Sequence, residues 1–256
     1  MSDLRLVFEP PIARLQLNRP ERRNAMSADM WRDIESLCAE LEARAEVSAV
    51  IVEGLGGHFC SGADISEFDD VFADLSRARA YLKAIERALE ALRRLDRPTI
   101  AKIEGATVGG GVALALACDV RFASEAAHIA IPPAKLGLLY GPVETQLLVE
   151  LVGPGVAKDL LFSGRSVNVQ EALRIGLVSR IFAPAELADA VEAEVRMWAT
   201  LSPSSIRGAK KVVRATLEGH VAGARELVEA AAMGADFREG RAAFKAKRKP
   251  IFARES

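Results

Sequence analysis

Two glycine-rich segments hold the residues whose types and spacing are best suited to chemistry. The first runs from Gly57 to Ile65 and the second from Gly105 to Ala113, and each follows a stretch with the pattern of a β-strand. Glycine at such a turn lets the backbone approach a ligand closely and aim its N–H groups at it. Two converging N–H groups could form an oxyanion hole, usually the largest single contribution when an oxygen becomes negatively charged. Taken alone, the run Gly109–Gly111 is also typical of a helix packed closely on a strand.

A turn with three arginines lies upstream, in the segment Asn18–Met26. Its arginines are Arg19, Arg22 and Arg23, and they come just before an expected helix start at Ser27. Guanidinium groups and helix N-termini both attract phosphate, so the turn could hold a phosphorylated ligand. The alternative is an ordinary solvated turn, because most charge clusters belong to exposed faces.

In this order and spacing, the three segments resemble the crotonase (enoyl-CoA hydratase/isomerase) superfamily. The resemblance continues through Gly137-Leu138 and the stretches 161–165, 172–178 and 244–250, so it covers essentially the whole chain. It implies an α/β fold, namely a crotonase-like spiral of ββα units with a helical C-terminal trimerisation region. It also implies an acyl-CoA thioester as substrate, a homotrimer or dimer of trimers, and no cofactor beyond the CoA moiety of the substrate.

The resemblance also assigns roles to single positions. Ala63 follows the last glycine of the first segment and Gly110 is the middle glycine of the triplet, so their N–H groups would hold the oxygen of a thioester enolate. The positions that match the family's CoA contacts are Arg23, Ala25, Ser61, Asp64, Ile65, Phe244 and Lys247. The last two fall in the family's C-terminal helix, which often touches the CoA of a neighbouring subunit.

Two positions depart from the pattern of the family's hydratases, which use two glutamates to add water across a double bond. Here those positions are Ala113, three residues after Gly110, and Pro133. Neither side chain can transfer a proton, and general acid–base help contributes about 10²–10⁴-fold per group. We therefore expect decarboxylase-like or isomerase-like chemistry in preference to the hydration of crotonyl-CoA.

Tyr140 and Glu144 could supply the missing polar chemistry, because the family places their segment near the acyl group. A phenol can donate a hydrogen bond or a proton, and methylmalonyl-CoA decarboxylase-like members carry a tyrosine at about this point. Some isomerases of the family place their single carboxylate three residues before Glu144, at the position of Gly141. The alternatives are that Tyr140 packs in the core and that Glu144 lies in the first turn of a helix, where the dipole favours a carboxylate.

Two other classes of function compete with an enzyme. A non-catalytic acyl-CoA-binding subunit would explain the loss of both glutamates, but the intact positions Ala63 and Gly110 favour catalysis. Some family members bind RNA. The 34 basic and 35 acidic side chains of this chain give no support to nucleic-acid binding. For the basic cluster Lys245–Lys249, a CoA phosphate is a sufficient partner, so we expect no nucleic-acid partner.

The elements that must position these residues alternate between strand and helix up to about Phe182, which predicts an α/β core. The expected elements are a hairpin of Leu4–Phe8 and Ile12–Leu17, a helix from Ser27 to about Arg44, a strand at Ala49–Val52, a helix at Leu75–Leu95, a strand at Thr99–Ile103, a helix at Gly109–Cys118, and strands at Val120–Ala123 and His128–Ala130. From Pro184 onward the pattern is helical, and Ser202-Pro203 marks a helix start. We expect a core with the CoA and oxyanion site at 1–183 and a helical C-terminal region at 184–256.

Composition excludes several other kinds of protein. The three cysteines lie far apart and the three histidines lack metal-ligand spacing, which argues against a metal site. Unpaired thiols fit a reducing compartment. The N-terminal residues lack the apolar segment of a signal peptide, and the weakly charged stretch Gly105–Ala117 is too short to span a bilayer. We expect no metal, no membrane partner and a cytoplasmic location.

Overall fold

A mixed β-sheet forms the centre of the fold in the computed structural model, which describes residues 2–253. Within those residues its strand order is β1-β2-β3-β4-β6-β9. The strands are β1 (Leu4–Glu9), β2 (Ile12–Leu17), β3 (Ala49–Gly54), β4 (Thr99–Ile103), β6 (Val120–Ser124) and β9 (Arg180–Phe182). The first two form the antiparallel hairpin that their alternating pattern predicts, and the other neighbours pair in parallel. The α/β class is therefore confirmed.

A second, small sheet lies beside the first and was only partly predicted. It pairs β5 (Ala106–Val108) with β7 (His128–Ala130), and β7 with β8 (Ser166–Val167). Strand β7 matches the predicted bounds, whereas the segment of β5 was expected to be a loop or part of a helix. Three residues beside a glycine carry no usable alternation, so the pairing of β5 with β7 comes from the tertiary structure.

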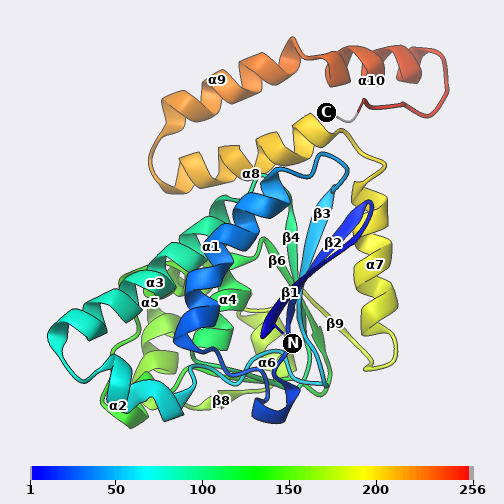
Figure 1. The fold of residues 1–256 in the computed structure, drawn as a ribbon. Coiled ribbons are helices and arrows are strands. Elements are labelled where there is room, and N and C mark those ends of the chain that lie inside the picture. Colours follow the sequence, from blue (N-terminus) through cyan, green and yellow to red (C-terminus); the bar gives the residue numbers. More distant parts are fainter. Residues whose placement is uncertain (1, 254–256) are drawn as a thin grey trace.

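Helices lie on both faces of the large sheet and beyond its end (Figure 1). They are α1 (Ala28–Glu42), α2 (Phe68–Val71), α3 (Leu75–Arg94), α4 (Gly110–Ala117), α5 (Pro142–Ser163), α6 (Val169–Arg174), α7 (Leu187–Trp198), α8 (Pro203–Leu217), α9 (Val221–Ala232) and α10 (Ala235–Lys245). The Ser27 hydroxyl caps α1 by accepting a hydrogen bond from Met30 N, and Ser202 caps α8 in the same way. Both predicted helix starts are confirmed.

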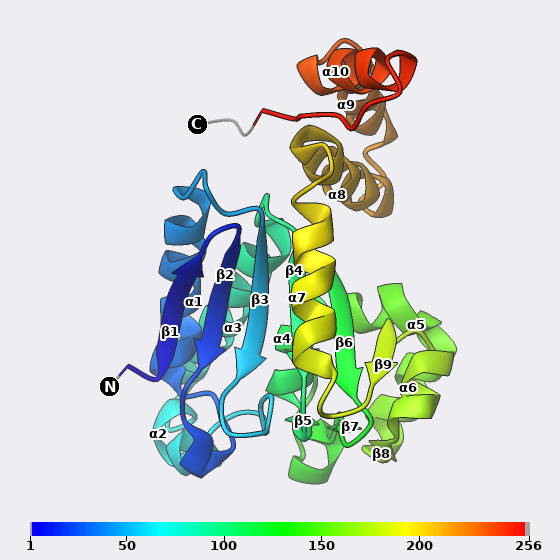
Figure 2. The ribbon, with the colours of Figure 1, turned by 90° about the vertical axis from the view of Figure 1, so that its right-hand side faces the viewer.

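The parallel strands are buried on both faces. Val50 and Val52 of β3 face a large core that contains residues of α1, α3 and α4, whereas Ala49 and Ile51 face helix α7. Figure 2 shows α7 standing against the sheet on the side opposite α1 and α3. Such two-sided burial is typical of parallel sheets and explains the continuous apolar run of this strand.

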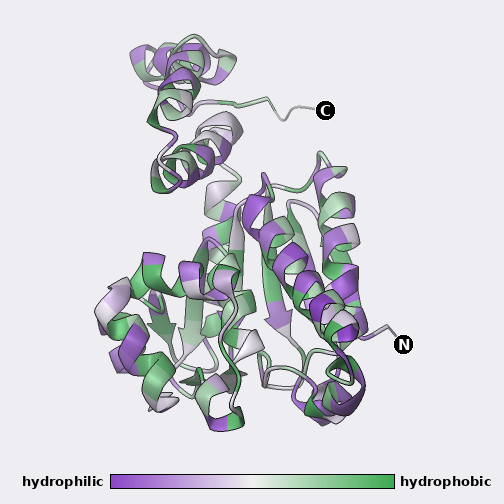
Figure 3. Cartoon of the chain, turned by 90° about the vertical axis from the view of Figure 1, so that its left-hand side faces the viewer, coloured by the Kyte–Doolittle hydropathy of each residue, from purple (hydrophilic) through white to green (hydrophobic). Residues whose placement is uncertain are grey.

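Helices α8, α9 and α10 project beyond the end of the sheet (Figures 1 and 2). Apolar and polar residues are mixed along them (Figure 3). Their large exposed apolar side chains include Val213, Leu217, Val221, Val228, Phe237 and Phe244. In the described part of the chain, no helix is both long enough and apolar enough to span a membrane.

Candidate active site

Ala63 lies in a loop whose backbone is held on both sides. Met26 N donates to Gly62 O at 2.7 Å, and Asp64 N donates to Met26 O at 2.8 Å. Gly62 adopts φ 107°, a conformation that favours glycine. Among the described residues, the N–H of Ala63 itself donates no hydrogen bond. The loop therefore presents a free donor from a firmly held peptide.

Gly110 is the first residue of α4, so its N–H has no partner within the helix. The preceding Gly109 has φ 51° and ψ −111°, which turns the chain sharply from β5 into the helix. Residues 111–117 are buried, so the helix lies inside the core with only its start reaching the site. A helix N-terminus carries a partial positive charge, which suits it to a developing anion.

The fold brings these two donors together. A Cβ atom placed on Gly110 would lie 3.7 Å from the backbone nitrogen of Ala63. One placed on Gly62 would lie 3.9 Å from the nitrogen of Gly110. The two unpaired nitrogens are therefore neighbours in the fold, as a hydrogen-bond acceptor shared by both would require.

Trp31 is a neighbour of this site that sequence reasoning missed. A Cβ atom on Gly110 would lie only 3.1 Å from its Cζ2 atom, so the indole ring limits what can stand at position 110. The ring is buried in α1, and its Nε1 atom has no hydrogen-bond partner among the described residues. The sequence features that could have drawn attention to Trp31 are its rarity, as one of two tryptophans, and its position shortly after the arginine turn.

Tyr140 points its hydroxyl at the start of α4. Its Oη donates to Gly109 O at 3.1 Å. Burial raises the pKa of Tyr140 well above its usual value, and the nearby Glu144 carboxylate adds to the effect. The phenol is therefore neutral at physiological pH and lies next to the peptide that carries the Gly110 donor.

Glu144 lies in the first turn of α5, as one reading of the sequence predicted. It is nevertheless 7% exposed, and its Oε2 atom is buried without a hydrogen-bond partner among the described residues. Burial raises its pKa, and the Glu86 carboxylate on α3 adds to the effect. A Cβ atom on Gly141 would lie 2.3 Å from Oε2, so this glycine leaves the room that the carboxylate occupies. A buried, unpaired carboxyl group is a candidate for proton transfer.

The two hydratase positions offer no proton donor in the structure. Ala113 is fully buried in α4, and Pro133 opens the 3-10 helix Pro133–Leu136. The Tyr140 hydroxyl does reach the start of α4, and Glu144 lies close enough to Tyr140 to affect its pKa.

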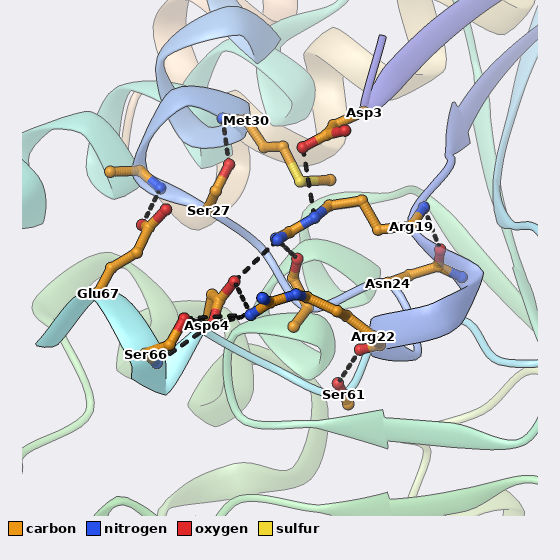
Figure 4. Close-up of polar contacts among 12 residues, drawn as sticks. Asp3, Arg19, Arg22, Asn24, Ser27, Met30, Ser61, Asp64, Ser66 and Glu67 are labelled. Carbon is orange, nitrogen blue, oxygen red and sulfur yellow. Dashed lines mark hydrogen bonds and ion pairs between the residues drawn. The ribbon is translucent and has the colours of Figure 1, made fainter. Parts of the chain in front are cut away.

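The arginine turn divides into paired and unpaired members. Arg19 and Arg22 both bind the carboxylate of Asp64, at 2.9 and 3.2 Å (Figure 4). Arg23 adopts a left-handed backbone conformation with φ 50°, and its side chain is exposed and forms no ion pair with the described residues. The turn therefore offers one free guanidinium to a ligand and uses the other two internally.

The remaining predicted CoA contacts fall into two places. Ser61 and Ala25 lie where the arginine turn meets the loop that carries Ala63. The backbone N–H of Ser61 donates to Arg23 O at 3.0 Å. Ile65 is 60% exposed beside them. Phe244 lies in α10, which packs on α8 and α9, and Lys247 follows it. Figure 1 shows α10 at the opposite end of the molecule from the turn, so one chain does not bring these two residues to the site.

Comparison with known proteins agrees with this geometry. The family model for enoyl-CoA hydratase/isomerase matches residues 8–255. The chain belongs to the enoyl-CoA hydratase/isomerase family. YngF of Bacillus subtilis, which bears the family's name, is 35% identical over 246 residues, 94% of this chain and 94% of that protein. The peroxisomal Delta(3,5)-Delta(2,4)-dienoyl-CoA isomerase of Arabidopsis thaliana is 31% identical over 255 residues, 94% of this chain and 92% of that protein.

The solved structures agree with the family. An enoyl-CoA hydratase/isomerase family protein from Hyphomonas neptunium has 39% sequence identity and a TM-score of 0.96, covering 99% of this chain and 98% of that one. The resemblance inferred from the motifs and the crotonase-like fold class are therefore confirmed. The protein is an acyl-CoA enzyme of the crotonase superfamily.

Proposed function

We propose that this enoyl-CoA hydratase/isomerase family member stabilises the enolate of an acyl-CoA thioester with the N–H groups of Ala63 and Gly110. The observation that carries the proposal is the proximity of these two unpaired donors, one of them at a helix N-terminus. Enolate formation moves negative charge onto the thioester oxygen, and preorganised donors are most effective where charge develops.

The CoA moiety would lie along the arginine turn and the oxyanion loop. Arg23 offers its guanidinium to a phosphate, and the half-buried Ser61 and the exposed Ile65 adjoin it, with Ala25 buried beside them. We propose that Phe244 and Lys247 reach the CoA of a neighbouring subunit in a homotrimer or dimer of trimers. Phe244 is 85% exposed and remote from the site of its own chain, which fits that arrangement. No cofactor beyond the CoA moiety is required.

The reaction would be that of a lyase or isomerase. Hydration needs a group that activates water and one that protonates carbon, and the family's two glutamates are replaced by Ala113 and Pro133. An enolate formed by decarboxylation or by loss of a proton needs fewer protein groups. It needs the oxyanion donors and one group that exchanges a proton with carbon.

Glu144 and Tyr140 would supply that remaining step. The raised pKa of Glu144 lets it exist as an acid that donates a proton to the enolate carbon or as a base that removes one. The neutral phenol of Tyr140 can orient a leaving carboxylate or deliver a proton, although its O–H donates to Gly109 O. Either residue therefore serves as the acid–base partner of the oxyanion hole.

A non-catalytic acyl-CoA-binding subunit is the second candidate, because both hydratase glutamates are missing. A screen of CoA thioesters, including malonyl-type acids, tests the two functions by following hydration, isomerisation and CO₂ release. We expect CO₂ release or double-bond migration on at least one thioester. Binding of CoA by saturation-transfer NMR without turnover of any thioester would favour the binding subunit. A short RNA in the same assay checks the nucleic-acid alternative.

A further inference from the structure

We infer that Asp64 is a positioning residue for the oxyanion hole, whose carboxylate, held by Arg19 and Arg22, fixes the peptide that presents the Ala63 N–H. The inference rests on the proposed function, because it concerns how the same hole is held in place. It gives Asp64 a role through its neighbour in the chain, where the family resemblance suggested a contact with CoA.

The Asp64 carboxylate is saturated with hydrogen bonds inside the protein (Figure 4). It accepts from Arg19 Nη2 at 2.9 Å and from Arg22 Nη1 at 3.2 Å. Ser66 adds its backbone N–H at 3.1 Å and its hydroxyl at 2.6 Å. The side chain is 7% exposed, so its oxygens are directed to these partners and away from solvent.

Arg19 connects this carboxylate to the turn on the other side of the loop. Its Nη1 donates to Ala25 O at 2.7 Å, and its Nε lies 3.3 Å from the carboxylate of Asp3. The Arg19 side chain is itself mostly buried, with 12% exposed. The Arg19 guanidinium thus binds both Asp64, which follows Ala63, and Ala25, which precedes Met26. Met26 is in turn hydrogen-bonded to both peptides that flank Ala63.

The backbone around Ala63 is held on both sides. Two backbone hydrogen bonds join it to Met26, and the Arg19–Asp64 ion pair joins the same two segments through side chains. The N–H of Ala63 takes no part in these hydrogen bonds. Burial would raise the pKa of Asp64, but hydrogen bonds from Ser66 and Arg19 outweigh it and hold the pKa below its usual value. The carboxylate is therefore charged at neutral pH and the pair is intact.

Replacing Asp64 by Asn keeps the shape and removes the charge that orders both arginines. Small misplacements of a catalytic group are costly, since a shift of about 1 Å can cost about 10²-fold in rate. We expect Asp64→Asn to weaken enolate stabilisation while CoA still binds, because the free guanidinium of Arg23 lies outside the pair.

The experiment uses acetoacetyl-CoA as a probe, because the loss of its C2 proton to solvent gives an enolate that absorbs in the near ultraviolet. The measured quantities are the enolate fraction of the bound probe and, by calorimetry, the affinity for CoA alone. For Asp64→Asn we expect an enolate equilibrium at least about tenfold lower, with CoA affinity within about twofold of the natural protein. Ser66→Ala removes two outer hydrogen bonds, the one that its hydroxyl donates to Asp64 and the one that it accepts from Arg22, and should shift the equilibrium less, in the same direction.

Asp119→Asn is the matched control. The Asp119 carboxylate also accepts three hydrogen bonds, from Thr99 N at 2.7 Å, Thr99 Oγ1 at 2.9 Å and Lys210 Nζ at 2.8 Å. Asp119 lies beside the start of β4, whereas the segment that carries Gly110 follows the other end of that strand. Asp119→Asn should lower the free energy of unfolding and leave the enolate equilibrium of the bound probe unchanged.

The possible outcomes distinguish a failure of the proposed oxyanion hole from a failure of the positioning role of Asp64. If the natural protein binds acetoacetyl-CoA without raising its enolate fraction, the proposed oxyanion hole is wrong. If the natural protein raises that fraction and both Asp64→Asn and Ser66→Ala match it, the positioning role is wrong. If Asp64→Asn does not fold, Ser66→Ala alone decides, and an unchanged enolate fraction in that variant overturns the inference.

Discussion

The hydroxyl of Tyr140 donates a hydrogen bond to the backbone oxygen of Gly109, at 3.1 Å. This contact joins the segment before α5 to the residue before the Gly110 donor, although the two are 31 positions apart. It gives the half-buried phenol a partner and fixes the ring beside the start of α4. The side chain whose segment the family places near the acyl group thus binds the carbonyl of the same peptide that carries the Gly110 N–H.

Tyr140→Phe and Glu144→Gln keep the shape of the site and remove its candidate acid–base groups. At least one of them should lower the turnover of the true substrate by about 10²-fold or more, as expected for general acid–base catalysis. Steady-state kinetics on the thioester found in the substrate screen measures the effect. Full activity in both test variants would contradict the proposed roles.

Gly110→Pro should abolish turnover while the chain still folds. Proline is tolerated in the first turn of a helix, but it deletes the N–H of position 110. Loss of one oxyanion donor costs about 10²–10³ in kcat. Gly110→Ala adds a similar Cβ atom against Trp31 and keeps the N–H, so it serves as the control. Equal losses in the two variants would show that crowding of Trp31, and not the missing donor, is responsible.

Hydration of crotonyl-CoA should be slow or absent. The side chains of Ala113 and Pro133 carry no proton to transfer, so the usual two-carboxylate route is closed. We expect a turnover below about 1 s⁻¹, the lower end of the ordinary enzyme range. The loss of the enoyl absorbance with time measures it. An ordinary hydratase rate would mean that Glu144 or another group carries out the whole reaction.

Glu144→Gln should change how stability depends on pH. The pKa of Glu144 is raised in the folded protein, so the folded state binds its proton more tightly than the unfolded state does. The stabilising contribution of this group is complete below its unfolded pKa of about 4.3 and is lost as the pH rises through the folded pKa. The variant should therefore gain stability relative to the natural protein as the pH rises from the unfolded pKa toward the raised folded pKa. Its advantage should grow by about 1.4 kcal/mol per pH unit between the two pKa values.

Urea unfolding of both proteins at several pH values measures this difference. A constant difference across that pH range would show that the carboxyl group titrates normally and that its burial has no consequence for protonation.

The molecule should assemble as a trimer or a dimer of trimers. Helix α10, which carries Phe244, lies at the opposite end of the molecule from the arginine turn (Figure 1), and α8–α10 expose several large apolar side chains. Light scattering at micromolar protein should give three or six times the mass of the chain. A monomeric mass would remove the proposed contribution of the C-terminal helix to CoA binding.

The sequence by itself determined most of the elements and the family. Periodic apolar positions, caps and prolines placed α1, α3 and α8 to within a few residues, because these signals act over one or two turns of chain. The glycine segments and their spacing identified the crotonase superfamily and the two candidate donors. The division at residues 183 and 184 remains a prediction, and α7, just beyond it, packs on the sheet of the core.

Only the tertiary structure decided how the candidate residues relate to one another. Asp64 stood in a motif as a CoA contact, but its carboxylate is bound by Arg19 and Arg22, which precede it by more than forty positions. Glu144 was also expected as a carboxylate in the first turn of a helix, and its burial without a partner among the described residues depends on how α5 packs in the fold. The sequence set Trp31 apart only as one of two tryptophans near the arginine turn, and nothing in it indicated that the ring lies against Gly110. Local patterns encode the conformation of nearby backbone, whereas hydrogen bonding and desolvation depend on which distant segments meet, and that is set when the whole chain packs.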